Sequence, residues 1–134
     1  MKIVENLSHT DNLKVYRVKG SNAKLITVIE VSGNWNTGCP AAPKAFHIAL
    51  AIAFGYNTDY VVDFSRANSI HPDMVESLRR FHTVITTELA TTSTPQLLFV
   101  GLAGSKESVI ERFLISSINP THSCLTLQHA MERL

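Results

Sequence analysis

Polar and hydrophobic residues alternate along residues 13–20, LKVYRVKG, a pattern that predicts a β-strand with one solvent-facing side. Residues 25–33, LITVIEVSG, are β-branched and almost entirely apolar, which predicts a second, more buried strand. The residues between the two runs, SNAK, are typical of a turn. We therefore expect an antiparallel hairpin near the start of the chain.

Helix-like and strand-like patterns alternate through the rest of the sequence. Residues 43–56 are apolar almost all round, with Pro43 near the start and Gly55 near the end, which predicts a helix covered on more than one side. The short β-branched run at 60–64 predicts a central strand. The remaining predicted elements are a helix from Pro72, a strand at 96–102, a helix from Ser105, a strand at 123–127 and a closing helical turn or two.

The resulting order, β-β-α-β-α-β-α-β-α, predicts one α/β domain over residues 1–134 with helices packed on a mixed sheet. Strands separated by helices need right-handed crossovers, so that part of the sheet should be parallel. The opening hairpin should add an antiparallel pair at one side. Residues 1–12 fall outside these elements and are expected to be an extra N-terminal segment.

Composition and charge argue against two classes of protein, those that bind nucleic acid and those embedded in a membrane. The chain is 45% hydrophobic and 17% charged, a globular balance. Its net charge is +1 and its largest basic cluster is the pair Arg79-Arg80, which argues against a nucleic-acid partner. The longest apolar run, around AFHIALAIAFGY, is about a dozen residues and too short to cross a bilayer. With no apolar leader and with Cys39 and Cys124 far apart, we expect a cytoplasmic protein that is not membrane-embedded.

No spacing typical of a metal or cofactor site occurs in the sequence. The six histidines include no pair four residues apart, and no H-E-x-x-H is present. We therefore expect neither a metal nor another cofactor.

The junction DFSRANSIHPDMVESL, residues 63–78, is the strongest candidate for a functional site. One interpretation is structural, because Pro72 suits a first helical position and Asp73 suits a first turn, with His71 or Ser69 as a cap. The other interpretation is that the same junction forms a surface that binds a protein partner. The pattern of residues leaves both open.

Three stretches, VVDFSRANSI, LLFVGL and CLTLQHAMERL, resemble in order and spacing the STAS domain of anti-sigma-factor antagonists and sulfate-transporter tails. The resemblance covers roughly residues 13–134. It implies a non-enzymatic regulatory module that acts through protein–protein contact. The implied partner is a kinase-like anti-sigma factor, a transporter component or another STAS chain, and an open sheet edge would allow a homodimer.

The family's antagonists carry a phosphoacceptor serine at the helix start, and this chain departs from that pattern. Aligned from Asp63, His71 stands at the family's aspartate, Pro72 at the acceptor, Asp73 at the next residue, and Met74 replaces a glycine. The resemblance therefore implies a module without the usual acceptor, in which Asp73 supplies a fixed negative charge. A shifted acceptor at Ser65 or Ser69 is a further alternative. The implied partner-binding residues are Ser69, His71, Pro72, Asp73, Glu76, Arg79 and Arg80.

The alternative function is a small α/β ligand- or nucleotide-binding protein, or an enzyme, with its site at the carboxyl ends of the strands. Gly101, Gly104 and Ser105 lie between a predicted strand and a predicted helix, where backbone N–H groups can hold an anion or simply form a capped loop. The Ser/His/Asp residues near those strand ends follow no recognised catalytic order. Trp35 could cover the end of the sheet or form an exposed anchor.

Overall fold

The computed structural model describes residues 3–10, 12–20, 23–35, 42–55, 57–88, 95–102, 123–124 and 126–134. In this part of the chain the elements follow one another as β1 (Ile3–His9), β2 (Leu13–Lys19), β3 (Leu25–Gly33), α1 (Ala42–Ala53), β4 (Thr58–Ala67), α2 (Pro72–Glu88), β5 (Leu97–Val100), β6 (Ser123–Cys124) and α4 (Leu127–Arg133). They form one mixed α/β domain, which confirms the coarse part of the predicted fold class, a mixed sheet with helices packed on it.

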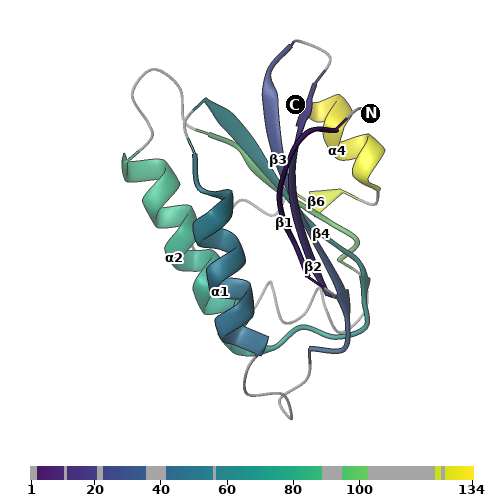
Figure 1. Ribbon diagram of the computed structural model, residues 1–134, viewed down its shortest axis with the longest axis vertical. Coiled ribbons are helices and arrows are strands. Elements are labelled where there is room, and N and C mark those ends of the chain that lie inside the picture. The colour runs from purple at the N-terminus through teal and green to yellow at the C-terminus, as the bar shows by residue number, and fades with distance from the viewer. Residues whose placement is uncertain are drawn as a thin grey trace.

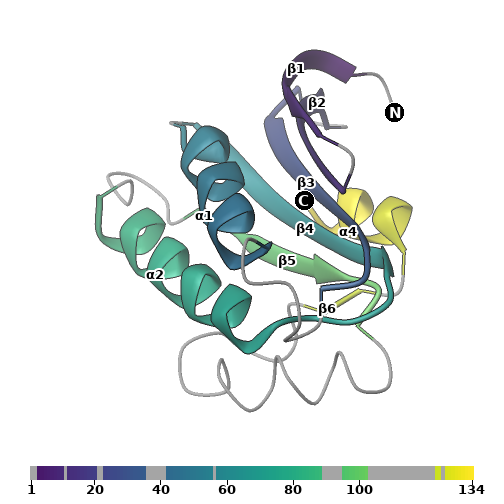
Figure 2. The same ribbon diagram turned by 60° about the horizontal axis from the view of Figure 1, so that its bottom comes forward.

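The strands lie in the sheet in the same order as in the sequence, from β1 to β6 (Figure 1). Strands β1, β2 and β3 pair antiparallel, whereas β3, β4, β5 and β6 pair parallel. This arrangement confirms the predicted hairpin and the predicted parallel strands. When each right-handed crossover leads to the next strand on the same side of the sheet, the connecting helices all lie on one face. Helices α1 and α2 do lie side by side on one face of this sheet (Figure 2).

Two apolar layers enclose the sheet. On one face, side chains of α1 and α2 such as Phe46 and Leu78 pack against Phe64 and Phe99. On the other face, α4 packs through Ala130 against a second cluster whose buried members are Tyr16, Val18, Ile26, Val28, Val61, Leu98 and Val100. Strand β4 is therefore buried from both sides along Thr58–Phe64, as the prediction of a central strand requires.

Residues 1–12, which the sequence predicts as an extra N-terminal segment, contain strand β1. Its pairing with β2 shifts register between Ile3 and Glu5 and again between Asn6 and Ser8. Each such irregularity displaces the side chains from a strict two-residue alternation, so no strand-like period is visible in the sequence. The added strand forms an edge of the sheet.

Three expectations about single elements were wrong. Both sides of β2 are covered, because Tyr16 and Val18 pack toward α4 while Val15 packs toward α1 and α2. Helix α1 is covered on one side only, with Ile48 49% and Ile52 39% exposed. The last predicted strand, residues 123–127, is too long at its end: Ser123–Cys124 is a strand, but Thr126 already caps α4, which begins at Leu127. The helix predicted from Ser105 lies outside the described residues.

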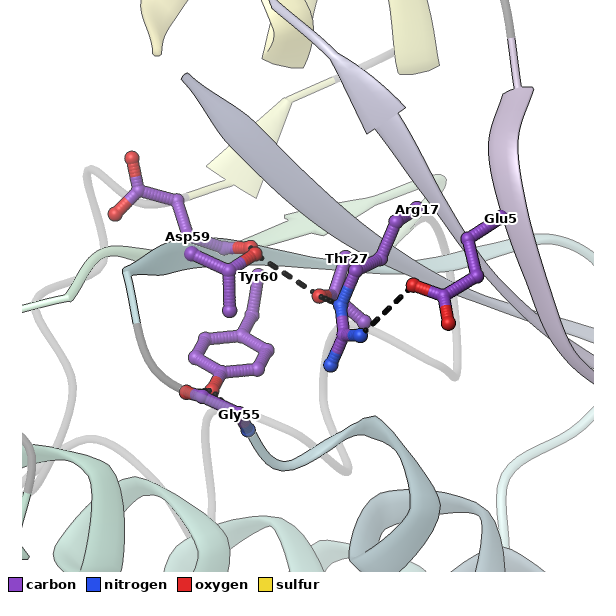
Figure 3. A network of polar contacts seen from close by, with 7 residues as sticks. Glu5, Arg17, Thr27, Gly55, Asp59 and Tyr60 are labelled. Atoms are coloured by element: carbon purple, nitrogen blue, oxygen red, sulfur yellow. Dashed lines mark hydrogen bonds and ion pairs between the residues drawn. The ribbon is translucent and has the colours of Figure 1, made fainter.

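Polar contacts tie the elements together at the amino end of the parallel strands (Figure 3). Arg17 of β2 pairs with Glu5 of β1 at 3.1 Å and donates to Thr27 of β3 at 3.2 Å. Thr27 and Thr58 of β4 share a hydrogen bond of 2.9 Å between their hydroxyls. Because these contacts link four neighbouring strands side by side, they fix the lateral arrangement at this end of the sheet.

Replacing Leu78 with Ala tests the layer between α2 and the sheet. Leu78 is fully buried, so we expect the free energy of unfolding to fall by about 2–5 kcal/mol. Val84→Ala is the matched control on the same helix, since Val84 is 39% exposed and its truncation should cost below about 1 kcal/mol. Urea unfolding measures both changes, and equal losses in the two variants would contradict the packing described.

Candidate functional site

The start of α2 is capped by the residue before it. The Nδ1 atom of His71 accepts a hydrogen bond from the Asp73 N–H at 3.0 Å, and the His71 carbonyl accepts one from the Met74 N–H at 3.0 Å. The same Nδ1 atom lies 3.8 Å from the Asp73 carboxylate. His71 therefore has the cap role that one interpretation of the sequence proposed.

The Asp73 side chain, in contrast, points into solvent. It is 71% exposed, and it follows Pro72, which occupies the first position of the helix. A carboxylate in the first turn interacts favourably with the helix dipole. The negative charge therefore stands at an accessible helix start with no hydroxyl at position 72.

Ser69 fastens the loop before α2 to the loop that leaves β3. Its hydroxyl accepts a hydrogen bond from the Trp35 N–H at 2.9 Å and donates one to Asn34 Oδ1 at 2.5 Å. Trp35 is only 4% exposed, and its indole N–H donates to the Ser32 carbonyl at 2.7 Å. Trp35 thus covers the end of the sheet, and this answers the question that the sequence left open.

The charged residues farther along α2 form a surface cluster. Glu76 pairs with Arg79 at 3.1 Å and lies 3.7 Å from Arg80. The spacing of three or four residues between Asp73, Glu76 and Arg80 places them on one side of the helix, opposite the buried Met74, Val75, Leu78, Phe81 and Ile85. Asp73, Glu76 and Arg80, three residues of the predicted partner surface, therefore lie on one side of α2, away from its buried face.

The predicted phosphoacceptors and the predicted catalytic-type residues have other partners. Ser65 donates its hydroxyl to Asp63 Oδ1 at 2.5 Å, and Ser69 is held by Trp35 and Asn34. With the His71 ring turned to its own helix, no hydrogen bond joins a Ser, a His and an Asp into a relay in the described part of the chain. A phosphate on Ser65 would lie beside the Asp63 carboxylate, where like charges repel.

Gly101 serves close packing in this structure. Its φ is +74°, and a Cβ at this position would lie 2.4 Å from the Ser65 Cα, so only glycine allows β5 to end against β4. Gly104 and Ser105, the other residues of the predicted anion site, lie outside the described residues.

Sequence reasoning missed a polar hollow on the face of the sheet that carries α4. We call it the sheet depression; it encloses about 240 Å³ and is lined by Lys14, Glu30, Val31, Ser32, Asp63 and Arg66. Lys14, Glu30 and Asp63 are register partners on three adjacent strands, so they form one row across the sheet. A clue was available in the sequence, because Glu30 and Asp63 are acidic residues that interrupt largely apolar strands near their carboxyl ends.

Tyr16 lies beside this depression. Its hydroxyl donates to Glu30 Oε1 at 2.5 Å. Burial raises the pKa of the Tyr16 phenol, and the hydrogen bond to Glu30 and the charges of Glu30 and Asp63 raise it further, against a smaller lowering by Arg66. Tyr16 therefore stays protonated as a hydrogen-bond donor over the physiological range.

Protein families and curated proteins were compared with the sequence. No protein-family model matches the chain, and no curated protein matches its sequence.

Within the described ranges, no three His, Cys, Asp or Glu side chains are grouped so that they could hold a metal ion. None of the helices described combines the length and apolar character that a membrane-spanning segment needs.

Replacing Tyr16 with Phe should reduce the loss of stability at alkaline pH. An unfolded chain ionises tyrosine near pH 10, whereas the folded pKa of Tyr16 is raised, so its contribution is complete below about pH 10 and is lost as pH rises further. Urea unfolding at about pH 8 and about pH 11 should show a smaller difference in Tyr16→Phe than in the wild type.

Some alkaline loss should remain in that variant, because burial also raises the pKa of Tyr60. Identical alkaline losses in the wild type and Tyr16→Phe would show that Tyr16 is not shielded as described.

Proposed function

We propose that this protein is a non-enzymatic regulatory module of the STAS type that docks on a protein partner through the start of α2. The docking surface consists of Ser69, His71, Pro72, Asp73, Glu76, Arg79 and Arg80. The observation that supports it is the Asp73 carboxylate, which is 71% exposed in the first turn of a capped helix. That helix has proline at the position where the antagonists of the STAS family carry a phosphoacceptor.

Asp73 would act as a permanent form of the charge that phosphorylation adds elsewhere. A phosphate changes a helix start by adding negative charge and acceptor oxygens, and a carboxylate supplies part of the same chemistry without a kinase. The fitting partner presents a cationic side chain to Asp73, because a charge-assisted hydrogen bond gives both attraction and register. The neighbouring Glu76 and Arg80 extend this polar contact along one side of α2.

The docking surface is held in place before any partner binds. Ser69 is bonded to Asn34 and to the Trp35 backbone, and the Asn68 N–H donates to the Gly33 carbonyl at 2.8 Å. A surface fixed in this way loses little conformational freedom on association, which favours affinity. The module would therefore recognise its partner as a rigid shape.

The fitting partners are a cytoplasmic kinase-like anti-sigma factor, a transporter component or another chain of the same type. Pairing of two copies through β1 has less support, because the register shifts in β1 interrupt the ladder that an added strand needs. A site for a small ligand is the second candidate function, and the sheet depression at the carboxyl ends of β3 and β4 favours it.

Asp73→Asn and Asp73→Lys test the docking role. We expect the partner's Kd to rise about tenfold for the neutral variant and further for the charge reversal, whereas Asp73→Asn should change the free energy of unfolding by about 1 kcal/mol or less. Glu88→Lys is the matched control, since it reverses an exposed charge at the other end of the same helix.

The partner is first found as the protein whose capture from the native cell is lost with Asp73→Lys but kept with Glu88→Lys. It is then purified, and its Kd is measured by calorimetry against all variants. An unchanged Kd together with lower stability of the Asp73 variants would make Asp73 a helix-start residue only.

A further inference from the structure

The floor of the sheet depression carries two carboxylates whose outer oxygens have no partner in the described part of the chain. Asp63 is only 8% exposed; its Oδ1 accepts both the N–H and the hydroxyl of Ser65, and Oδ2 accepts nothing. Glu30 accepts the Tyr16 hydroxyl through Oε1, and Oε2 accepts nothing. Two neighbouring carboxylates repel each other, and a largely buried one needs a donor to offset its lost hydration.

The two cationic residues that line the depression, Lys14 and Arg66, form no ion pair with these carboxylates. Lys14 lies directly across from Glu30 in the register of β2 and β3, yet the two make no ion pair. Arg66 follows Asp63 on β4 and also makes no ion pair with any described residue. Lys14 and Arg66 are exposed, whereas Glu30 is half-buried and Asp63 is buried, so we take the cations as the rim and the carboxylates as the floor. The depression thus has an anionic floor, a cationic rim and no net charge.

We propose that the sheet depression binds a small zwitterion, a molecule with a primary ammonium group and an acidic group on one short skeleton. The ammonium group sits on Glu30 and Asp63, and the acidic group lies between Lys14 and Arg66. The ammonium supplies three N–H donors, which suits the two free carboxylate oxygens. The volume of about 240 Å³ is below that of drug-sized pockets and fits a ligand of amino-acid size.

The charges favour a zwitterion over ligands with one sign of charge. A divalent cation such as Ca²⁺ prefers six or more oxygen ligands, and here it would have two carboxylates and would face two cationic side chains. An anion alone would be placed above a carboxylate floor, and an amine alone would leave the rim without a counter-ion. This proposal concerns the α4 face of the sheet and does not depend on the docking surface at α2.

The test is a calorimetric titration of the full chain with glycine, β-alanine and longer ω-amino acids, at concentrations on the order of millimolar. Their single-charge analogues, n-alkylamines and n-carboxylates of matched length, serve as ligand controls, and CaCl₂, MgCl₂ and inorganic phosphate are titrated separately. We expect at least one ω-amino acid to bind tenfold or more tightly than both of its analogues. The length of the ω-amino acid that binds most tightly then indicates the distance between the two carboxylates and the two cationic side chains.

Four variants assign the binding to the residues named. Glu30→Gln and Asp63→Asn keep the acceptor atoms used by Tyr16 and Ser65, and each should weaken the best zwitterion at least tenfold. Arg66→Gln should remove the preference for the zwitterion over its amine analogue. Glu132→Gln, an exposed carboxylate on α4, should bind like the wild type.

Each contrary result overturns the proposal. It is wrong if no zwitterion binds over the tested range, if zwitterions bind no better than their single-charge analogues, or if only a divalent cation or phosphate binds. It is also wrong if Glu30→Gln and Asp63→Asn, with unchanged thermal unfolding, bind as the wild type does.

Discussion

The burial of β4 from both sides is the constraint on which the rest of the structure depends. Thr58–Phe64 lie under α1 and α2 on one face and toward α4 on the other, so any polar group in this strand must find its partners in place. Asp59 and Asp63 point to the same face, four residues apart. The Oδ1 atom of Asp59 accepts a hydrogen bond from the Gln96 N–H at 2.9 Å. Its Oδ2 atom forms an ion pair with Lys24 at 2.7 Å, but the geometry of that contact is not that of a hydrogen bond.

The two ends of the parallel strands therefore differ in character. At the amino end, Asp59 and the Arg17–Thr27–Thr58 contacts use the polar groups to join neighbouring strands. At the carboxyl end, polar groups remain available on both sides of the sheet, in the depression beside α4 and at the start of α2. Both proposed roles follow from this difference.

The sequence predicted those elements whose pattern depends on burial alone. The apolar run of β4 and the helical spacing of Met74, Leu78 and Phe81 were sufficient, because both record which side faces the core. Strand β1 was missed because its irregular register removes the alternation of polar and apolar residues. The predictions of how many sides of β2 and α1 are buried failed because the periodicity of one segment does not tell how many layers pack against it. At the helix start, Pro72 and Asp73 were placed correctly, whereas the row of Lys14, Glu30 and Asp63 depends on cross-strand register, which one sequence does not contain.

The position of Trp35 gives this molecule an optical reporter of its own. It is the single tryptophan of the chain, it is packed in the apolar layer under α1, and its two N–H groups are bonded to Ser32 and Ser69. Its emission should be that of a shielded indole in the native state and should shift to longer wavelength on denaturation. Since Ser32 lines the sheet depression and Ser69 belongs to the docking surface, one intrinsic fluorophore stands between the two regions and can register occupancy of either without a label.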